Sequence, residues 1–323
     1  MRACPGTRSP TPTTMSPSAR TPTRAPGHQA TLRALAAKLH TLAPQEGFLP
    51  THLSDVTLMR VDRSCDPVAV LQEPSFVIAL QGVKRGYLDG EVLRYEGGQC
   101  LVVSVPMHFA CDTVVQAPEA PMLALSVRID LDTVREMANR LAGMGLTAAP
   151  PSHARAMSVM DMGPRELDWC DRLLDALSSR ADAAILGPQL VRELHYRVLT
   201  SPAGICLRAL ANWHGKLGAI HRSIERMRTD YTQDLQVAAL AQDAAMSASS
   251  YHASFKAVTG QSPMQYLKAV RLHRARELLT VDGRRATEVA FDVGYQSPSQ
   301  FSKEYKRFFG RSPSQAREPL ASP

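Results

Sequence analysis

The sequence predicts an α+β protein of two domains, an antiparallel β-barrel or sandwich with flanking helices followed by an all-α domain. Short β-rich runs separated by turn residues recur about every ten residues between residues 76 and 128. After residue 220, apolar residues recur at intervals of three and four, the spacing of amphipathic helices. The 323 residues are enough for two domains of about 150 residues each.

Residues 1–30 are expected to form a disordered tail. The first 27 residues contain six prolines and six threonines but no Leu, Ile, Val or aromatic residue. Such a segment buries too little apolar surface to offset the entropy lost on ordering. Its Arg-rich, acid-free composition also suits a transit peptide, and a start of translation at Met15 or later would leave part of it out. A secretory signal is excluded because no apolar region precedes Leu32.

The first domain, residues 31–210, is expected to begin with β structure. Its five or six short strands include 76–80, 86–90, 91–95, 100–105 and 122–127. Asp89-Gly90 lies between two apolar runs and indicates a β-hairpin. Short strands at this spacing favour a small barrel or sandwich.

Helices are expected to follow the strands in the first domain. Apolar residues recur at helical spacing over 131–142, 165–178 and 188–200. The last two helices are candidates for a homodimer contact, but they would serve equally well as a cap on the barrel. A linker over 211–222 is expected to lead to the second domain, residues 223–320.

The second domain contains an internal repeat with an offset of 50 residues. Phe255-Lys256 recurs as Tyr305-Lys306, and Ser262-Pro263 recurs as Ser312-Pro313. Each copy is expected to form two short helices joined by a tight turn, over 235–256 and 286–307. One amphipathic helix, Met264–Thr280, joins the copies.

The second helix of each copy has the features of a recognition helix. Ser247 and Ser297 are suited to cap these helices, and Pro298 is tolerated in the first turn. Apolar anchors four residues apart would turn the polar side chains outward. With a linker helix of about 24 Å, the two recognition helices are expected to lie about 34 Å apart, which is one turn of duplex DNA.

The charge distribution favours the same interpretation. Residues 220–323 hold 15 basic and 10 acidic side chains, whereas residues 41–219 hold 16 basic and 20 acidic ones. Residues 1–40 hold six basic residues and no acidic one. Clustered Lys and Arg attract nucleic acid, although a solvated basic face is the alternative.

At this point the residues resemble the AraC/XylS family of transcriptional regulators. Residues 294–313, Gly-Tyr-Gln-Ser-Pro-Ser-Gln-Phe-Ser-Lys-Glu-Tyr-Lys-Arg-Phe-Phe-Gly-Arg-Ser-Pro, match that family's signature segment almost without departure. The linker pattern from Arg271 to Leu279 also fits. Gln72-Glu-Pro-Ser-Phe76, Gln81-Gly82 and 198–202 look like the cupin-type N-terminal sensor domain of one subgroup.

The resemblance implies a cupin-like sensor and dimerisation domain joined to a DNA-binding domain with two helix-turn-helix units. It implies a sequence-specific regulator in the cytoplasm that acts as an activator, with double-stranded DNA and RNA polymerase as partners and an unknown small molecule as effector. Ala253 stands where many members place Arg, so base reading by the first helix is expected to be weak. The residues expected to contact DNA are Ser247, Ser249, Ser250, His252, Ala253, Lys256, Ser297, Pro298, Ser299, Gln300, Ser302, Lys303, Lys306 and Arg307.

An effector pocket is expected within the barrel, which is wide enough for one small molecule. Strand phase does not separate inward from outward residues, and core packing is the favoured role for any one candidate. A constitutive or architectural DNA-binding protein without an effector is the alternative. The candidates for the pocket are Phe76, Ile78, Tyr87, Tyr95, Met107, His108 and Phe109.

Three other chemical functions are alternatives to a regulator that is switched by a small molecule. A metal-dependent cupin enzyme is disfavoured because His108 is the one histidine between residues 53 and 152. A suicidal methyl acceptor needs clustered cysteines near the N-terminus, and Cys4 stands alone there. Sensing of electrophiles or oxidants by Cys100 and Cys111 is a further alternative, although free cysteines are usually buried apolar residues.

Other function classes lack their sequence signals. The six cysteines show no C-x-x-C spacing, so reduced thiols are expected rather than disulfides or a zinc ribbon. No run of 18 apolar residues occurs, and common hydrolase and nucleotide-binding motifs do not occur. No cofactor, no metal and no enzymatic activity are expected.

Overall fold

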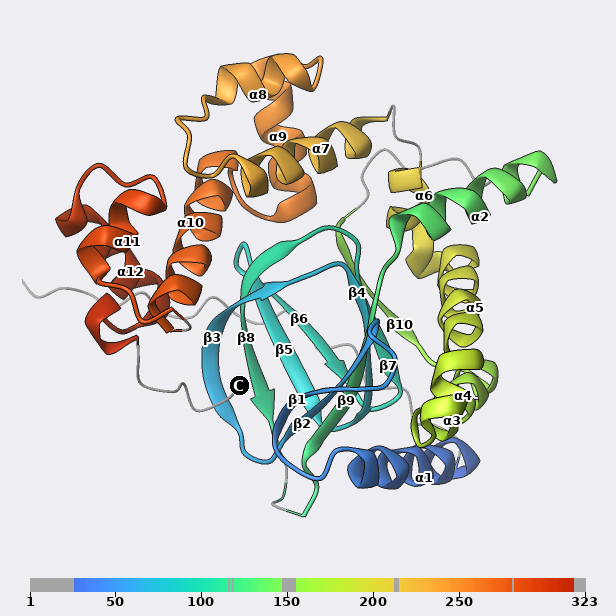
Figure 1. The fold of residues 1–323 in the computed structure, drawn as a ribbon. Helices are drawn as coiled ribbons and strands as arrows, with labels where there is room; N and C mark the ends of the chain where they lie inside the picture. Colours follow the sequence, from blue (N-terminus) through green and yellow to red (C-terminus); the bar gives the residue numbers. More distant parts are fainter. Residues whose placement is uncertain are drawn as a thin grey trace, which may run out of the picture.

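The computed structural model describes residues 26–115, 117, 119–146, 155–211, 215–280 and 282–316. The strands form a central barrel, with helices α1 to α6 on its right and lower right, α7 to α9 above it and α10 to α12 on its left (Figure 1). This arrangement confirms the predicted fold class. The strands are β1 (Gly47–Pro50), β2 (Val56–Val61), β3 (Cys65–Gln72), β4 (Ser75–Gln81), β5 (Val83–Leu88), β6 (Glu91–Glu96), β7 (Gln99–Val103), β8 (Met107–Val114), β9 (Met122–Arg128) and β10 (Met157–Asp161).

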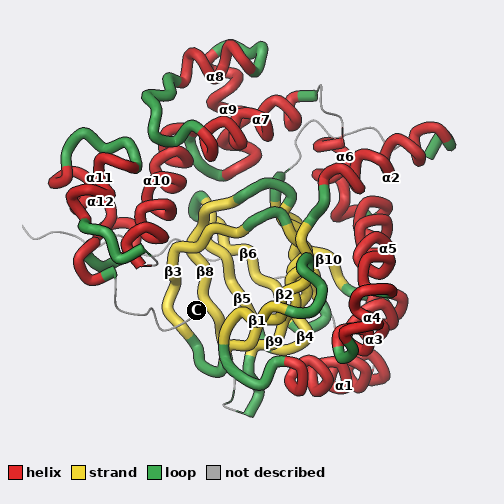
Figure 2. The backbone as a smooth tube through the Cα atoms, in the orientation of Figure 1, coloured by secondary structure: helices red, strands yellow, loops and turns green. Residues whose placement is uncertain are grey.

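The described strands form two antiparallel sheets that face each other (Figure 2). One sheet has the order β1-β2-β9-β4-β7-β10 and the other has the order β3-β8-β5-β6. The predicted hairpin at Asp89-Gly90 joins β5 to β6. Both turn residues have positive φ, +49° and +80°, as the tight two-residue hairpin turn requires. Asp and Gly are among the residues that adopt this conformation most readily.

Several strands were not predicted from the sequence. The segments 47–72 and 107–114 contribute β1, β2, β3 and β8. Strand β10 also interrupts the expected order of strands followed by helices, since it pairs with β7 and places Met157 opposite Val103. The segment follows helix α2 in the sequence but completes the edge of the larger sheet.

Helices cover the outer face of the larger sheet. The predicted helices 131–142, 165–178 and 188–200 correspond to α2, α3 and α5. Alternate residues of β4 separate two apolar clusters: Phe76 and Ile78 pack toward these helices, whereas Val77 and Ala79 lie in the barrel interior. The helices of this domain are α1 (Pro26–Leu42), α2 (Leu131–Gly143), α3 (Pro164–Leu177), α4 (Arg180–Ile185), α5 (Gly187–Thr200) and α6 (Ile205–Ala211), with a 3-10 turn at Pro202–Gly204.

Helix α1 corrects the predicted extent of the tail. It begins at Pro26, so residues 26–30, expected to be disordered, are helical. Proline is favoured in the first turn of a helix because its missing amide hydrogen loses no bond there. Leu35 and Leu39 are almost fully buried against the sheet and hold the helix in place. The remainder of the predicted tail, residues 1–25, lies outside the described residues.

The C-terminal domain contains six α-helices in its described part. Helix α7 begins inside the expected linker 211–222, because Leu217, Ile220 and Ile224 fall on one helical face and are buried. Its described helices are α7 (Lys216–Thr229), α8 (Val237–Asp243), α9 (Ala248–Thr259), α10 (Pro263–Thr280), α11 (Ala286–Asp292) and α12 (Pro298–Phe309), followed by a 3-10 turn at Pro313–Gln315.

The domain docks on the barrel through α10 and the turn that precedes it. The Gln261 side-chain amide donates a hydrogen bond to the carbonyl oxygen of His108 at 2.7 Å. The Tyr266 hydroxyl donates to the carbonyl oxygen of Pro106 at 2.9 Å. Both acceptors belong to the β7–β8 region, so the linker helix is fixed on the smaller sheet.

Candidate nucleic-acid interface

The two recognition helices, α9 and α12, begin and end in the same way. The hydroxyl of Ser247 accepts a hydrogen bond from the amide of Ser250, and the hydroxyl of Ser297 accepts one from the amide of Gln300, both at 3.3 Å. Gly260 and Gly310 end the helices with positive φ, +70° and +75°. Serine is favoured at the N-cap and glycine at the C-cap of a helix. The 50-residue repeat of the sequence therefore corresponds to a repeat of the same helix boundaries in the structure.

Aromatic pairs fix which face of each recognition helix points outward. Tyr251 and Phe255 in α9 are fully buried, with ring centroids 5.7 Å apart. Phe301 and Tyr305 in α12 are fully buried, with centroids 5.6 Å apart. Residues four apart share a helical face, so these pairs leave the opposite face free for DNA.

All fourteen residues predicted to contact DNA lie at solvent-accessible positions. Four of them, Ser250, Ser297, Pro298 and Ser302, are partly exposed. Their contact with DNA stays a prediction. The exposed ones are Ser247, Ser249, His252, Ala253, Lys256, Ser299, Gln300, Lys303, Lys306 and Arg307.

Glu304 is a residue of α12 that sequence reasoning missed. Its carboxylate accepts hydrogen bonds from Lys268 at 3.0 Å, from the Tyr295 hydroxyl at 2.9 Å and from Gln300 at 3.4 Å. Burial alone raises the pKa of this carboxyl, but the three hydrogen bonds bring it below its ordinary value. Glu304 therefore ties the second recognition helix to α10 and orients the side chain of Gln300.

Lys256 is held differently from its repeat partner Lys306. Its ammonium nitrogen lies 3.1 Å from a carboxylate oxygen of Asp89, at the tip of the β5–β6 hairpin. The barrel therefore reaches one of the predicted DNA contacts of α9. No sequence signal indicated this pair, because the two residues are distant in the chain and meet through domain docking.

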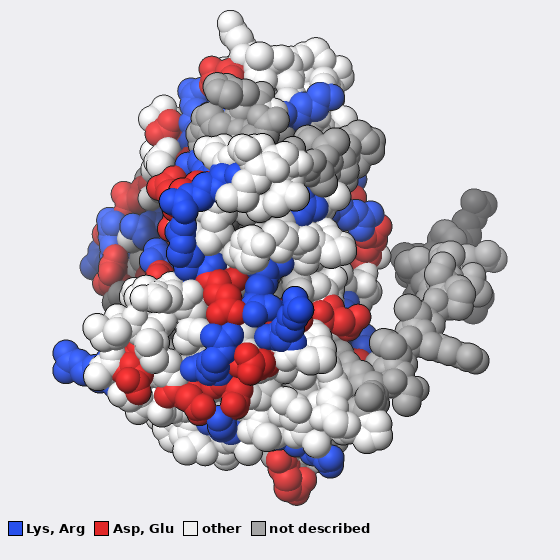
Figure 3. Space-filling view, turned by 90° about the vertical axis from the view of Figure 1, so that its right-hand side faces the viewer, with Lys and Arg blue, Asp and Glu red and all other residues white. Residues whose placement is uncertain are grey.

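The helical side of the first domain carries charges of both signs. Figure 3 shows Lys and Arg interleaved with Asp and Glu over this face. Lys38 bridges Asp171 and Asp175, and Arg172 pairs with Glu193. Interleaved charges neutralise one another at short range, so this face offers a polyanion little net attraction.

Two family models match the chain. The model for the AraC-type transcriptional regulator N-terminus matches residues 52–205. A helix-turn-helix domain model matches residues 240–319, which include α9, α10, α11 and α12. The chain belongs to the AraC family of transcriptional regulators.

Curated members of the AraC family are similar over part of their length. The HTH-type transcriptional activator RhaS of Yersinia pestis strain Pestoides F is 28% identical over 103 residues, 32% of this chain and 38% of that protein. A putative AraC-like transcription regulator of Streptomyces lividans is 32% identical over 112 residues, 34% of this chain and 37% of that protein. The matched part is thus little more than a third of either relative.

A solved structure shares the fold over most of the chain. It is the unsaturated fatty acid-bound ToxT of Vibrio cholerae strain SCE256, with a TM-score of 0.55 and 10% sequence identity. The match covers 82% of this chain and 95% of that one. At this identity the likeness shows the fold alone.

The seven candidates for an effector pocket lie on both sides of the barrel wall in this AraC-family chain. Phe76 and Ile78 face the outer helices, and the Phe76 ring packs edge-on against His195 at 5.1 Å. His108 lies on the outer side of β8 against α10. The Tyr87 hydroxyl donates to Asp112, which also pairs with Arg85 beside it.

Three of the seven pocket candidates remain on the inner side. Tyr95, Met107 and Phe109 belong to the cluster that fills the barrel. Phe109 also lines a cavity that opens toward α9. The barrel interior contains Lys84, which is 7% exposed and directs its ammonium group toward the Met59 sulfur at 3.4 Å.

The two thiols considered for sensing do not form a pair. Cys100 packs toward the outer helices, whereas Cys111 lies in the barrel interior. Burial raises the pKa of both thiols, which disfavours the reactive thiolate. Cys4 lies outside the described residues. Within the described ranges, no group of three or more His, Cys, Asp or Glu side chains is arranged to hold a metal ion.

None of the described helices combines the length and apolar character that crossing a bilayer requires.

Proposed function

We propose that this chain binds specific DNA sequences through α9 and α12 and activates transcription from the promoters that contain them. The observation that carries the proposal is the duplicated geometry of the recognition helices, each with a serine cap, a buried aromatic pair and an outward polar face. Paired helix-turn-helix units with this orientation are suited to successive major grooves of one duplex.

The outward residues divide into two classes of contact. Lys306 and Arg307 lie in the last turn of α12 and supply charge to phosphates. Gln300 and Lys303 lie in its first two turns, where side chains reach base edges. The first helix offers Ser249 and His252 beside the methyl group of Ala253, so its base reading is weaker than that of α12.

Activation is proposed to proceed through contact with RNA polymerase. The similar RhaS proteins carry the name transcriptional activator, which supports this direction of control. The AraC-type N-terminal domain is proposed to respond to a small molecule, as the fatty acid-bound ToxT structure illustrates for a protein of the same fold. A homodimer through the solvent faces of α3 and α5 is proposed as the functional form.

The experiment that tests this function is selection of bound duplexes from a random DNA pool by the full chain at fixed salt. We expect one enriched motif with two contacted segments about ten base pairs apart, one for each recognition helix. Selection with Gln300→Ala and with Ser249→Ala assigns the segments, since each variant relaxes only its own half. Enrichment of no motif would contradict sequence-specific binding and favour an architectural role.

A further inference from the structure

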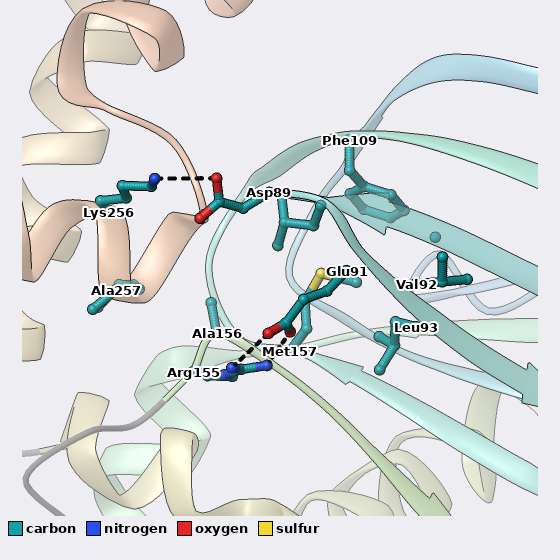
Figure 4. A pocket seen from close by; sticks show the side chains of 14 residues that line it. Asp89, Glu91, Val92, Leu93, Phe109, Arg155, Ala156, Met157, Lys256 and Ala257 are labelled. Atoms are coloured by element: carbon teal, nitrogen blue, oxygen red, sulfur yellow. Dashed lines mark hydrogen bonds and ion pairs between the residues drawn. The ribbon is translucent and has the colours of Figure 1, made fainter. Parts of the chain in front are cut away.

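A cavity of about 370 Å³ lies between the two domains. It is enclosed by the β5–β6 hairpin, the segment that enters β10, and the C-terminal end of α9 (Figure 4). The size falls within the range of small-molecule sites. Its apolar lining residues from the barrel domain are Leu88, Val92, Leu93, Phe109, Ala156 and Met157, and those from α9 are Ala257 and Val258.

Every charged side chain that lines this cavity is already paired. Asp89 pairs with Lys256 at 3.1 Å, and Glu91 forms a two-point ion pair with Arg155. Both pairs lie at the edge of the cavity (Figure 4). A charged ligand would have to break one of these pairs, whereas a neutral ligand would leave both intact. The electrostatics of the lining therefore select against ligands that carry a net charge.

The hairpin exposes apolar surface at the cavity. Val92 is 56% exposed although it lies in a strand and lines the cavity. The Leu88 side chain lies against Gly260, where a Cβ atom would come within 2.5 Å of it. The amide of Ala156 also donates to the carbonyl oxygen of Val258 at 3.3 Å. The walls are thus held together at their edges, and an apolar face is left inside.

We propose that this interdomain cavity binds a neutral, largely apolar small molecule. Such a ligand gains from burying its own surface and that of Val92, and it requires no unpaired polar group from the protein. The site differs from the one expected within the barrel, because the C-terminal end of the recognition helix α9 forms one of its walls. The regulatory role of this site rests on the proposed DNA-binding function, which a ligand bound here would regulate.

Ligand binding and DNA binding are coupled through Lys256. A ligand that contacts both walls favours the arrangement in which the walls are together. In that arrangement Lys256 is paired with Asp89 and is not available to a DNA phosphate. The ligand is therefore expected to weaken DNA binding by the full chain.

The binding site is tested without DNA by titrating the full chain with Nile red, a neutral apolar dye. Val92→Lys places a charge in the apolar wall, and Phe48→Lys is the matched control, since Phe48 in β1 is also 56% exposed and does not line the cavity. We expect the first variant to weaken dye binding about tenfold and the second to leave it unchanged, because a dye that covers position 92 would have to desolvate the new charge. Equal effects of the two variants would overturn the site.

The ligand class is tested by displacement of the dye with 1-decanol, decanoate and decyltrimethylammonium. The alcohol is expected to displace Nile red at the lowest concentration, and the order should be unchanged in Asp89→Asn. Stronger displacement by either ion would overturn the neutral class. Asparagine tolerates the left-handed conformation of this turn, so the variant removes the ion pair and keeps the hairpin.

The coupling is tested separately with a duplex from the selection experiment. Decanol is expected to weaken DNA binding by the unmodified chain and to have less effect on Asp89→Asn, whose freed Lys256 raises the salt slope of DNA binding by about 0.9. Dye binding with no effect of decanol on DNA affinity would overturn the coupling alone. Failure of the chain to bind any duplex would overturn the DNA-binding function, whereas the dye titration would still decide whether the cavity binds a ligand.

Discussion

Two copies of one helical unit are attached to the rest of the molecule in different ways. In the first unit, Tyr251 and Phe255 belong to the apolar cluster that also fills the barrel. In the second, Phe301 and Tyr305 belong to a smaller cluster formed with α10 and α11. The same local architecture thus shares an apolar core with the barrel in one copy and has its own core in the other.

This difference indicates how one DNA-binding domain divides its work. A unit that shares its core with the barrel follows changes in the barrel, whereas a unit with its own core keeps its shape. Helix α10 joins both, since Tyr266 and Leu267 pack with the first cluster and Leu272 and Leu279 with the second. We infer that the first unit transmits regulation and the second provides the more constant reading of DNA.

The largest expected effect is a loss of stability when the apolar core of either helical unit is disrupted. Phe255→Ala and Phe301→Ala each remove a fully buried ring, at a cost of about 3 to 5 kcal/mol in the free energy of unfolding. Urea unfolding of the full chain should show Phe255→Ala lowering the stability of the barrel together with the first unit. Phe301→Ala should instead produce an early, separate transition of the second unit. A single identical transition in both variants would contradict the division into two cores.

Base reading should be unequal between the units. Gln300→Ala or Lys303→Ala is expected to cost about 1 to 3 kcal/mol of discrimination at one base pair. Ala253 offers no hydrogen-bonding group, so Ala253→Ser should change preference in the first half-site much less. Competition binding with single-base variants of the selected duplex measures both effects. Equal changes in the two halves would contradict the unequal roles.

The contributions of the two units to phosphate binding should also be unequal, with a smaller difference than in base reading. Lys306→Ala and Arg307→Ala are each expected to reduce the slope of log affinity against log salt by about 0.9, without altering sequence preference. Lys256→Ala should reduce it less, because this ammonium group is already paired with Asp89. Fluorescence anisotropy at several salt concentrations measures the slopes. A full reduction in Lys256→Ala would show that DNA displaces Asp89 completely.

The sequence predicted local structure better than the orientation of the strands. Serine caps, glycine ends and aromatic pairs four residues apart act within a few positions, so both recognition helices and the hairpin at Asp89 could be placed. Strand β4 is buried on both faces over Ser75–Leu80, which removes the alternation that separates inside from outside. For this reason the sequence did not separate Phe76 and Ile78, which face the outer helices, from the residues that face the barrel interior.

Contacts between distant segments were also beyond the sequence. The roles of Glu304 and of the pair between Lys256 and Asp89 depend on how α10 and the hairpin dock, and no spacing rule relates those segments. The interdomain cavity has the same origin. Its walls come from four segments that are separated in the chain, the β5–β6 hairpin, β8, the segment that enters β10 and the end of α9.

The smallest expected effect is a pH dependence of stability at the junction between the helical units and the barrel. His108 of β8 and His273 of α10 lie with ring centroids 4.9 Å apart and are almost fully buried. Within the described part of the chain, neither ring nitrogen of His108 has a hydrogen-bond partner, and the Nε2 atom of His273 has none either. The His273 ring also packs edge-on against Phe308 and Phe309 of α12. The junction therefore joins the second unit to the barrel through two neutral imidazoles.

Acid is expected to loosen this junction. Burial, together with the Arg276 charge, lowers the pKa of His273 to about 4, and burial, with His273 and Arg228 nearby, lowers that of His108. A histidine whose pKa is lower when folded adds stability above its unfolded pKa of about 6.5 and loses it as the pH falls toward the folded value.

The contribution of His273 to stability should therefore fall by about 1 kcal/mol between pH 6.5 and 5.5, and His108 should change stability in the same direction. His273→Leu should weaken this pH dependence, whereas His52→Leu, at an exposed turn, should not. Urea midpoints measured between pH 7.5 and 5.5 decide the matter, and an unchanged pH dependence in His273→Leu would contradict the assignment. Because the His273 ring packs against Phe308 and Phe309 of α12, the acid-sensitive transition should involve the second unit before the first.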